Sequence, residues 1–331
     1  MPVYLCKENS MKTTNNIMLQ VFLALIPALL VKTYFWGINT IFLLVVAILT
    51  ATVTEIVVAK LRSKNLLAEV SNNSAAVTCM ILVLSLPSGI PYYIMLICTL
   101  VAILIAKQIY GGMGQNIFNP AMVGVAVFLI TYPQFITYWN IPSNELNYQV
   151  SNMLGAFTGT SAVDAYTQAT PLTEIKTLMQ MGNHANLNQD LANITQTNYY
   201  PWLVYALSFL AGGFYLWVRK IITLTLPLVS IVAFVGLSCL HYLITGYSQA
   251  NPLYSLIYGS MIFGAFFIVT DPVTAPQYRT GRIIYAISIG CLAYIIRAFT
   301  NYNDGIAFAV LLSNILVPLL DKFFTPKEFG R

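Results

Sequence analysis

A segment rich in glycine and asparagine, residues 111–121, supplies groups that could bind a polar ligand within an otherwise apolar sequence. Three glycines lie in it: Gly111, Gly112 and Gly114. Glycine accepts positive φ and allows close approach to the backbone, so that amide N–H groups can converge on a ligand. Asn116 and Asn119 add side-chain amides, which both donate and accept hydrogen bonds. In isolation, however, the segment is explained better as a glycine-rich turn between two helices.

A second group of chemical interest is the carboxylate of Asp271, which stands directly before Pro272 at the end of an apolar run. An ionisable residue at membrane depth is a functional candidate, because an unused charge is costly there. The Asp-Pro pair can also simply end a helix at a turn, since proline restricts the residue before it. Asp271 is therefore a candidate binding residue with a structural alternative.

The third group lies in the longest polar stretch, residues 134–200, which is rich in Asn, Gln, Thr and Ser. A loop longer than about 12–15 residues is usually either functional or disordered. The asparagine-rich part, residues 183–198, is compatible with a flexible linker. Residues 155–178 differ, because small residues have a definite arrangement there and Pro171 imposes an extended or turn conformation on Thr170. This part is the better candidate for a functional site.

Cysteine and histidine give no sign of a metal or haem site. The five cysteines are isolated, four of them lie in apolar runs, and no C-x-x-C pair exists: Cys6, Cys79, Cys98, Cys239 and Cys291. Packing explains them best. His184 lies in the polar stretch and His241 near the end of an apolar run, so axial haem pairs are lacking. We expect no metal, and no catalytic side chain stands out.

The composition indicates a membrane protein. Apolar residues make up 58% of the 331 residues and charged residues 8%, against about 45–50% and about 25% in an average globular protein. The net charge of +5 is scattered along the chain, which excludes the basic patch of a nucleic-acid-binding protein. Lipid is therefore the solvent in which this chain folds.

A membrane span needs about 20 apolar residues of helix. Ten runs qualify or nearly do: 17–36, 38–59, 75–87, 91–110, 117–133, 201–218, 221–243, 253–270, 282–299 and 305–324. The run 75–87 is short and ends at Pro87, and the run 253–270 is marginal. We expect these two to be interrupted or re-entrant helices, which are allowed only where protein or water satisfies the backbone.

The basic residues orient these runs. With the N-terminus inside, 13 of the 16 Lys and Arg residues fall on the inner side: Lys7, Lys12, Lys60, Arg62, Lys64, Lys107, Arg219, Lys220, Arg279, Arg282, Lys322, Lys327 and Arg331. Lys32, Lys176 and Arg297 fall outside. The positive-inside rule then predicts cytoplasmic ends (1–16 and 325–331) and a polar loop on the outer side.

The fold class expected from this pattern is an all-α polytopic membrane protein of about ten transmembrane helices. Five spans (17–133) precede the loop 134–200 and five (201–324) follow it, so the halves enter the membrane with opposite orientation and can form an inverted repeat. Few acids lie in or near the spans: Glu55, Asp271, Asp304 and Asp321. For Glu55, near the inner end of its span, a side chain that reaches the interface is at least as good an explanation as function.

The polar loop resembles a known modification site. Asp164, Thr167, Ala169 and Thr170 match the D-x-x-[ST]-G-A-[ST] sequence in which bacterial flavin transferases esterify the last hydroxyl with the phosphate of FMN. The resemblance implies that Thr170 carries FMN and that the other three form the acceptor motif. Gln168 replaces the usual glycine, which puts the efficiency of modification in doubt.

Two further segments extend the resemblance to the whole chain. Residues 111–121 (GGMGQNIFNPA) and 267–276 (FIVTDPVTAP) resemble the two signatures of the RnfD/NqrB family, in the right order around the loop. Because only residues 1–16 precede the first span, the chain looks like the RnfD branch of that family, from the Rnf complex. The NqrB branch, from the sodium-pumping NADH:quinone reductase, normally has a longer N-terminal extension.

This resemblance implies a redox-carrier subunit of an ion-translocating oxidoreductase in the bacterial inner membrane, with the loop periplasmic. It implies the other Rnf subunits (A, B, C, E and G) and a flavin transferase as partners. A second, non-covalent flavin (riboflavin) is implied near Gly111, Gly112, Gly114, Asn116, Asn119 and Asp271. Two alternatives stay open: a relative from the quinone reductase, and a channel or transporter for a small solute built on interrupted helices.

Overall fold

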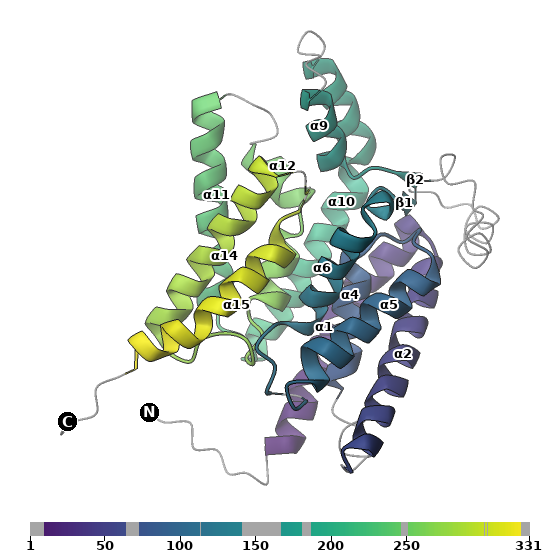
Figure 1. The fold of residues 1–331 in the computed structure, drawn as a ribbon. Helices are drawn as coiled ribbons and strands as arrows, with labels where there is room; N and C mark the ends of the chain where they lie inside the picture. The colour runs from purple at the N-terminus through teal and green to yellow at the C-terminus, as the bar shows by residue number, and fades with distance from the viewer. Residues whose placement is uncertain are drawn as a thin grey trace.

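The computed structural model describes residues 10–63, 73–112, 114–140, 167–180, 187–245, 251–300, 302 and 304–325. The regular secondary structure of this part of the chain is helical apart from one pair of two-residue strands (Figure 1). Before the polar loop come α1 (Ser10–Trp36), α2 (Asn39–Leu61), α4 (Ser74–Ser85), α5 (Tyr92–Ile103) with its π-helical continuation η1 (Leu104–Gln108), and α6 (Pro120–Thr131). After it come α10 (Leu187–Val218), α11 (Thr225–Thr245), α12 (Pro252–Ile257), α13 (Met261–Phe263) with the π-helix η4 (Gly264–Ile268), α14 (Arg279–Phe299) and α15 (Ile306–Phe323).

Six helices of the described residues are long and apolar enough to cross a membrane: Thr14–Trp36, Asn39–Leu61, Tyr200–Val218, Thr225–Thr245, Arg279–Phe299 and Ile306–Phe323. Three shorter apolar helices accompany them: Ser74–Ser85, Tyr92–Gln108 and Pro120–Thr131. The chain is thus an all-α polytopic membrane protein, as the composition predicts. Several expected spans are shorter than their apolar runs; α6, for example, begins at Pro120 because the Asn119 side chain caps it.

The helices form two groups, with α11, α14 and α15 on one side and α2, α4, α5 and α6 on the other (Figure 1). In the first group α5 packs between α2 and α6, and in the second α14 packs between α11 and α15. Contacts of α1 with α10 and of α6 with α15 join the groups. The same packing order therefore occurs in both groups.

The interruptions expected at Pro87 and in the run 253–270 are both present. The helix α4 ends at Ser85, and α12 is separated from α13 by residues 258–260. Lys32 of α1 satisfies the end of α4, because its buried Nζ donates to Val83 O at 2.7 Å and Leu86 O at 2.5 Å. The second break needs glycine, since a Cβ on Gly259 would lie 2.6 Å from Ser255 O.

The polar loop is more structured than its composition suggests. The described part holds a 3₁₀ turn (Pro133–Phe135), the strand β1 (Trp139–Asn140), the strand β2 (Thr167–Gln168) and the helix α9 (Pro171–Gln180). Helix α10 begins at Leu187, inside the range 134–200 expected for the loop. The helix therefore extends beyond the apolar run 201–218, because helical hydrogen bonding does not require apolar side chains.

Candidate functional site

The residue before α9, Thr170, is held by local hydrogen bonds that place its hydroxyl at a helix N-terminus. Thr170 O accepts from Glu174 N at 3.0 Å, and Thr170 Oγ1 accepts from Thr173 N at 3.3 Å. The two hydroxyl oxygens of Thr170 and Thr173 lie 2.8 Å apart. Pro171 suits the first helical position, where its missing N–H costs nothing. The positive end of the helix dipole at Thr170 favours a negatively charged group on this oxygen.

The strand pair fixes the backbone that leads to Thr170. β2 pairs antiparallel with β1, so that Gln168 lies opposite Trp139 and Thr167 opposite Asn140. Asn140 is buried, and its Nδ2 donates to Trp36 O at 2.9 Å. Ala169 and Thr170 follow the strand and are half-buried. Asp164 lies outside the described residues.

Helix α9 is anchored on the ends of other helices. Leu172 and Ile175 are buried, and Lys176 Nζ donates to Arg297 O at 3.2 Å, to Tyr302 O at 3.4 Å and to Thr300 O. These carbonyls lie at and beyond the end of α14, where a cation is favourable. Burial and the neighbouring charge of Arg297 lower the pKa of Lys176. The position of Thr170 is thereby tied to the membrane helices.

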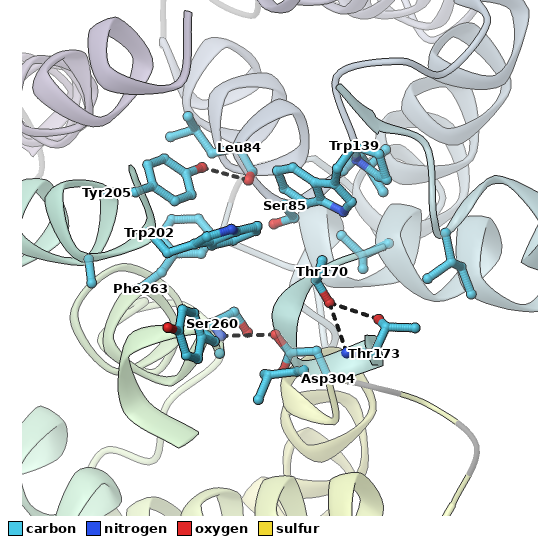
Figure 2. A pocket seen from close by; sticks show the side chains of 18 of the residues that line it. Leu84, Ser85, Trp139, Thr170, Thr173, Trp202, Tyr205, Ser260, Phe263 and Asp304 are labelled. Atoms are coloured by element: carbon cyan, nitrogen blue, oxygen red, sulfur yellow. Dashed lines mark hydrogen bonds between the residues drawn. The ribbon is translucent and has the colours of Figure 1, made fainter. Parts of the chain in front are cut away.

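Thr170 lines a cavity between the two interrupted helices, which we call the Thr170 pocket (Figure 2). The centre of a water-sized sphere can reach about 120 Å³ of it. Its walls include the end of α4 and the break between α12 and α13. Among its aromatic side chains, five form a series: Trp139, Trp202, Tyr205, Phe209 and Phe263. Successive ring centroids of the aromatic side chains in this series are 4.5–6.3 Å apart.

Two polar atoms of this pocket have no hydrogen-bond partner among the described residues. They are Trp202 Nε1, on a residue that is 6% exposed, and Ser260 Oγ. Asp304 lies beside Ser260, and its Oδ2 accepts from Ser260 N at 2.9 Å (Figure 2). A buried polar group without a partner indicates a missing ligand or water. The pocket is therefore aromatic, with N–H and O–H groups available to a ligand that accepts hydrogen bonds.

A second cavity, the Asn119 pocket, lies at the opposite ends of α4 and α10. About 180 Å³ of it can be reached by the centre of a water-sized sphere. It brings together three of the six residues predicted to bind a second ligand: Asn116, Asn119 and Asp271. Asn119 Nδ2 donates to Asp271 Oδ2 at 3.2 Å, and Asn119 Oδ1 accepts from Met122 N at 3.2 Å. One side chain thus caps α6 and joins the two signature segments.

Gly111, Gly112 and Gly114, which precede Asn119 in the sequence, lie outside the Asn119 pocket. Their φ values are +122° at Gly111, +108° at Gly112 and +84° at Gly114, in the region that favours glycine. Gly111 N donates to Gln108 O and Gly112 N to Lys107 O, so both amides end the helix. None of the three lines the Asn119 pocket. Their positive φ explains why glycine is needed, and it serves the turn that leads to Asn116.

An ion pair stands in the wall of the Asn119 pocket, and sequence reasoning missed it. Lys107 Nζ lies 2.6 Å from Glu55 Oε1 and 2.5 Å from Ser74 Oγ, and both charged side chains are 2% exposed. The interpretation of Glu55 as a side chain that reaches the interface is therefore wrong, because its partner lies inside the protein. Lys107 was expected on the cytoplasmic surface; the π-helix η1 carries it inward.

The residues that complete the Thr170 pocket also escaped sequence reasoning. Trp202 and Ser260 lie within apolar runs that contain no recognisable motif. Their polar atoms stand out only in the folded structure, where no described residue forms a hydrogen bond with them. Asp304 was one of the few acids that the sequence places near the spans. The glycine that follows it, Gly305, was the signal that Asp304 lies in a turn, since Asp-Gly is typical of turns.

Comparison with known proteins shows the family of the chain. Residues 7–330 match the family described as NQR2, RnfD, RnfE family. The D subunit of the ion-translocating oxidoreductase complex of Klebsiella pneumoniae (strain 342) is 39% identical over 345 residues, which cover 97% of this chain and 96% of the relative. The proteins of the same name from Haemophilus ducreyi (strain 35000HP / ATCC 700724) and Sodalis glossinidius (strain morsitans) are 40% and 41% identical, each covering 96% of this chain and 95% of the relative. The chain therefore belongs to the NQR2, RnfD, RnfE family.

Proposed function

We propose that this protein is the membrane redox subunit of an Rnf-type ion-translocating complex and carries FMN through a phosphoester on Thr170. The observation that carries the proposal is the position of the Thr170 hydroxyl, which lies at the N-terminus of α9 and in the wall of an aromatic pocket. The names of the relatives support the complex. Its other members are the A, B, C, E and G subunits, and a flavin transferase attaches the FMN.

The residues of the Thr170 pocket fit the group. The phosphate is favoured at the helix N-terminus. The carbonyl groups of the flavin ring accept hydrogen bonds, which suits Trp202 Nε1–H and Ser260 Oγ–H. Aromatic side chains provide faces for a planar ring. FMN supplies one- or two-electron transfer, and the protein holds and orients it.

Gln168 is the departure from the acceptor motif. It belongs to β2, where its backbone is opposite Trp139. Glycine weakens a strand, so Gln168 supports the strand that precedes the acceptor. Asp164, Thr167 and Ala169 complete the motif that the transferase reads.

Attachment is tested by expressing the full chain with and without a flavin transferase and viewing a denaturing gel under ultraviolet light. We expect fluorescence at the mass of the chain only with the transferase. If no fluorescence appears, the proposal is wrong, and a small-solute transporter built on interrupted helices becomes the better explanation. Assays of the whole complex with ferredoxin and with quinone as alternative redox partners separate the Rnf assignment from the quinone-reductase one.

The exchange Trp202→Phe is expected to lower the midpoint potential of the bound FMN. Phenylalanine keeps the aromatic face but lacks the indole N–H. That N–H stabilises a flavin carbonyl more strongly when electrons have been added to the flavin ring, so its removal destabilises the reduced flavin. The stabilisation lost is about 1 kcal/mol, the value of one hydrogen bond. A redox titration followed by absorbance measures it. Trp36→Phe is the matched control, because Trp36 Nε1 is also buried and finds no partner in the part of the chain that the structure describes, but it does not line the pocket. Equal shifts in both variants contradict the assignment.

We also propose that the Asn119 pocket binds riboflavin without a covalent bond, through Asn116, Asn119 and Asp271. Asn119→Ala removes both the bridge to Asp271 and the cap of α6, so we expect the flavin released by acid precipitation to fall to background while gel fluorescence persists. Asn251→Ala is the matched control, since Asn251 caps α12 before Pro252 and lies outside this pocket. Equal loss of free flavin in both variants, measured by chromatography, counts against the site.

For the topology we propose ten crossings in two inverted halves, with cytoplasmic ends and residues 134–200 in the periplasm of a bacterial inner membrane. The matching packing order of the two helix groups and the breaks at corresponding places support this arrangement. Single cysteines introduced in a cysteine-free chain test it. A membrane-impermeant thiol reagent should label position 183 in intact spheroplasts and position 327 only after lysis.

A further inference from the structure

A small cavity apart from both pockets lies where α9 meets the ends of α11 and α14. Four polar side chains line it, Lys176, His241, Tyr294 and Arg297, together with three apolar ones from α9 and α14. The centre of a water-sized sphere can reach about 30 Å³ of it, which is room for one water molecule or one small ion. No carboxylate of the described residues lines it.

The guanidinium of Arg297 is incompletely satisfied. Arg297 is 9% exposed, its Nη1 donates to Ser255 O at 2.8 Å, and its carbon Cζ lies 5.8 Å from the centre of the Phe234 ring. Its Nη2 has no hydrogen-bond partner among the described residues. Leaving a charged donor without a partner is more costly than leaving a neutral one. A hydrogen-bond acceptor in the adjoining cavity would therefore stabilise the Arg297 guanidinium.

The charges around Arg297 do not balance. The ammonium of Lys176 lies on the carbonyls at the end of α14, and the two positive side chains disfavour one another. The carboxylate that acts on Arg297 is Asp304, and its oxygens already accept from Ser260 N and Ile306 N. Among the residues that line the cavity, Lys176 and Arg297 are cations and none is a carboxylate, so the lining carries an excess of positive charge that a water molecule would not offset.

Histidine adds a further donor to the same space. His241 Nδ1 lies 2.7 Å from the Tyr294 hydroxyl, and its ring stacks on Phe299 with the centroids 5.7 Å apart. When the tyrosine hydroxyl donates to Nδ1, the other ring nitrogen carries a hydrogen and is a donor. In that arrangement Arg297 Nη2 on α14 and the second ring nitrogen of His241 on α11 are the donors left on this side of the cavity.

We propose that this cavity binds one small monovalent anion of the halide class, with Arg297 as its main ligand and His241 as a supporting one, while Lys176 contributes only its positive charge because its three N–H groups are donated to carbonyls. The ion joins α9 to α11 and α14. Because α9 begins directly after Thr170, the ion helps to fix the position of that residue. The site does not depend on flavin, so it can be tested in protein that is expressed without a flavin transferase.

The test uses the purified full chain in detergent at constant ionic strength, with sodium gluconate replaced stepwise by sodium chloride or bromide. We expect saturable stabilisation by both halides, with a rise in Tm of about 3 °C, the size expected for one ligand at ten times its Kd. The chloride nuclear magnetic resonance line should broaden with protein and sharpen again on addition of bromide. Absence of both effects in the unmodified chain overturns the proposal and leaves water in the cavity.

Substitution then assigns the ligand. Arg297→Gln keeps a donor toward Ser255 O and removes the charge, so the halide effect should disappear whatever the Tm of the variant. Arg219→Gln is the matched control, because Arg219 is exposed after α10, and it should keep the full effect. A halide effect that persists in Arg297→Gln overturns the site. Should that variant fail to fold, His241→Gln is expected to weaken halide binding several-fold, and unchanged binding contradicts the supporting role.

Discussion

Thr170→Val is expected to abolish covalent flavin on this chain. Valine has nearly the shape of threonine but no oxygen to form the phosphoester. The side chain also loses its hydrogen bond from Thr173 N, which costs about 1 kcal/mol of helix stability as for other lost caps. Gel fluorescence at the mass of the chain should fall to background, and the intact mass should lack the FMN increment.

Two neighbouring exchanges make this result specific. Thr170→Ser keeps both the acceptor oxygen and the cap, so fluorescence should return in part or in full. Thr173→Val removes the hydroxyl that lies 2.8 Å from Thr170 Oγ1 and should leave the flavin in place. If instead Thr173→Val removes the fluorescence and Thr170→Val retains it, the acceptor is Thr173 and the motif has been misread.

Lys107→Met is expected to cause the largest loss of stability of any single exchange considered. Glu55 and Lys107 are each 2% exposed and lie 2.6 Å apart. Removal of one partner leaves a buried carboxylate without its countercharge, which costs about 3–5 kcal/mol. Thermal unfolding in detergent, followed by tryptophan fluorescence, should show a marked fall in Tm.

The double exchange Glu55→Leu with Lys107→Met separates charge from packing. Because no buried charge remains, most of the lost stability should return. Lys60→Met is the control on α2, since Lys60 is exposed, and its Tm should hardly change. A double variant as unstable as Lys107→Met alone would show that the cost comes from packing around η1 and not from the unpaired charge.

The local sequence was sufficient for several features of the fold. Apolar runs of membrane length gave the six long helices, since in lipid the backbone must satisfy itself within each helix. Pro87 marked the end of a short apolar run, and α4 ends at Ser85, whereas the break at residues 258–260 was expected only somewhere within the marginal run 253–270. Pro171 predicted an extended or turn conformation at Thr170 but not the helix α9 that begins there, although capping and proline at the first helical position act within one turn.

Only the tertiary structure decided which partners the charged and polar side chains contact. Lys107 and Lys32 were assigned to opposite surfaces by counting charges, and each is buried against atoms more than 30 residues away in the chain. Likewise, Asn119 meets Asp271 across 152 positions, and Trp202 and Ser260 face the pocket of Thr170. The physical reason is that a buried polar group must find a partner wherever packing brings one. The sequence by itself determined which groups need partners, and the packing of the two helix groups decided which partners they have.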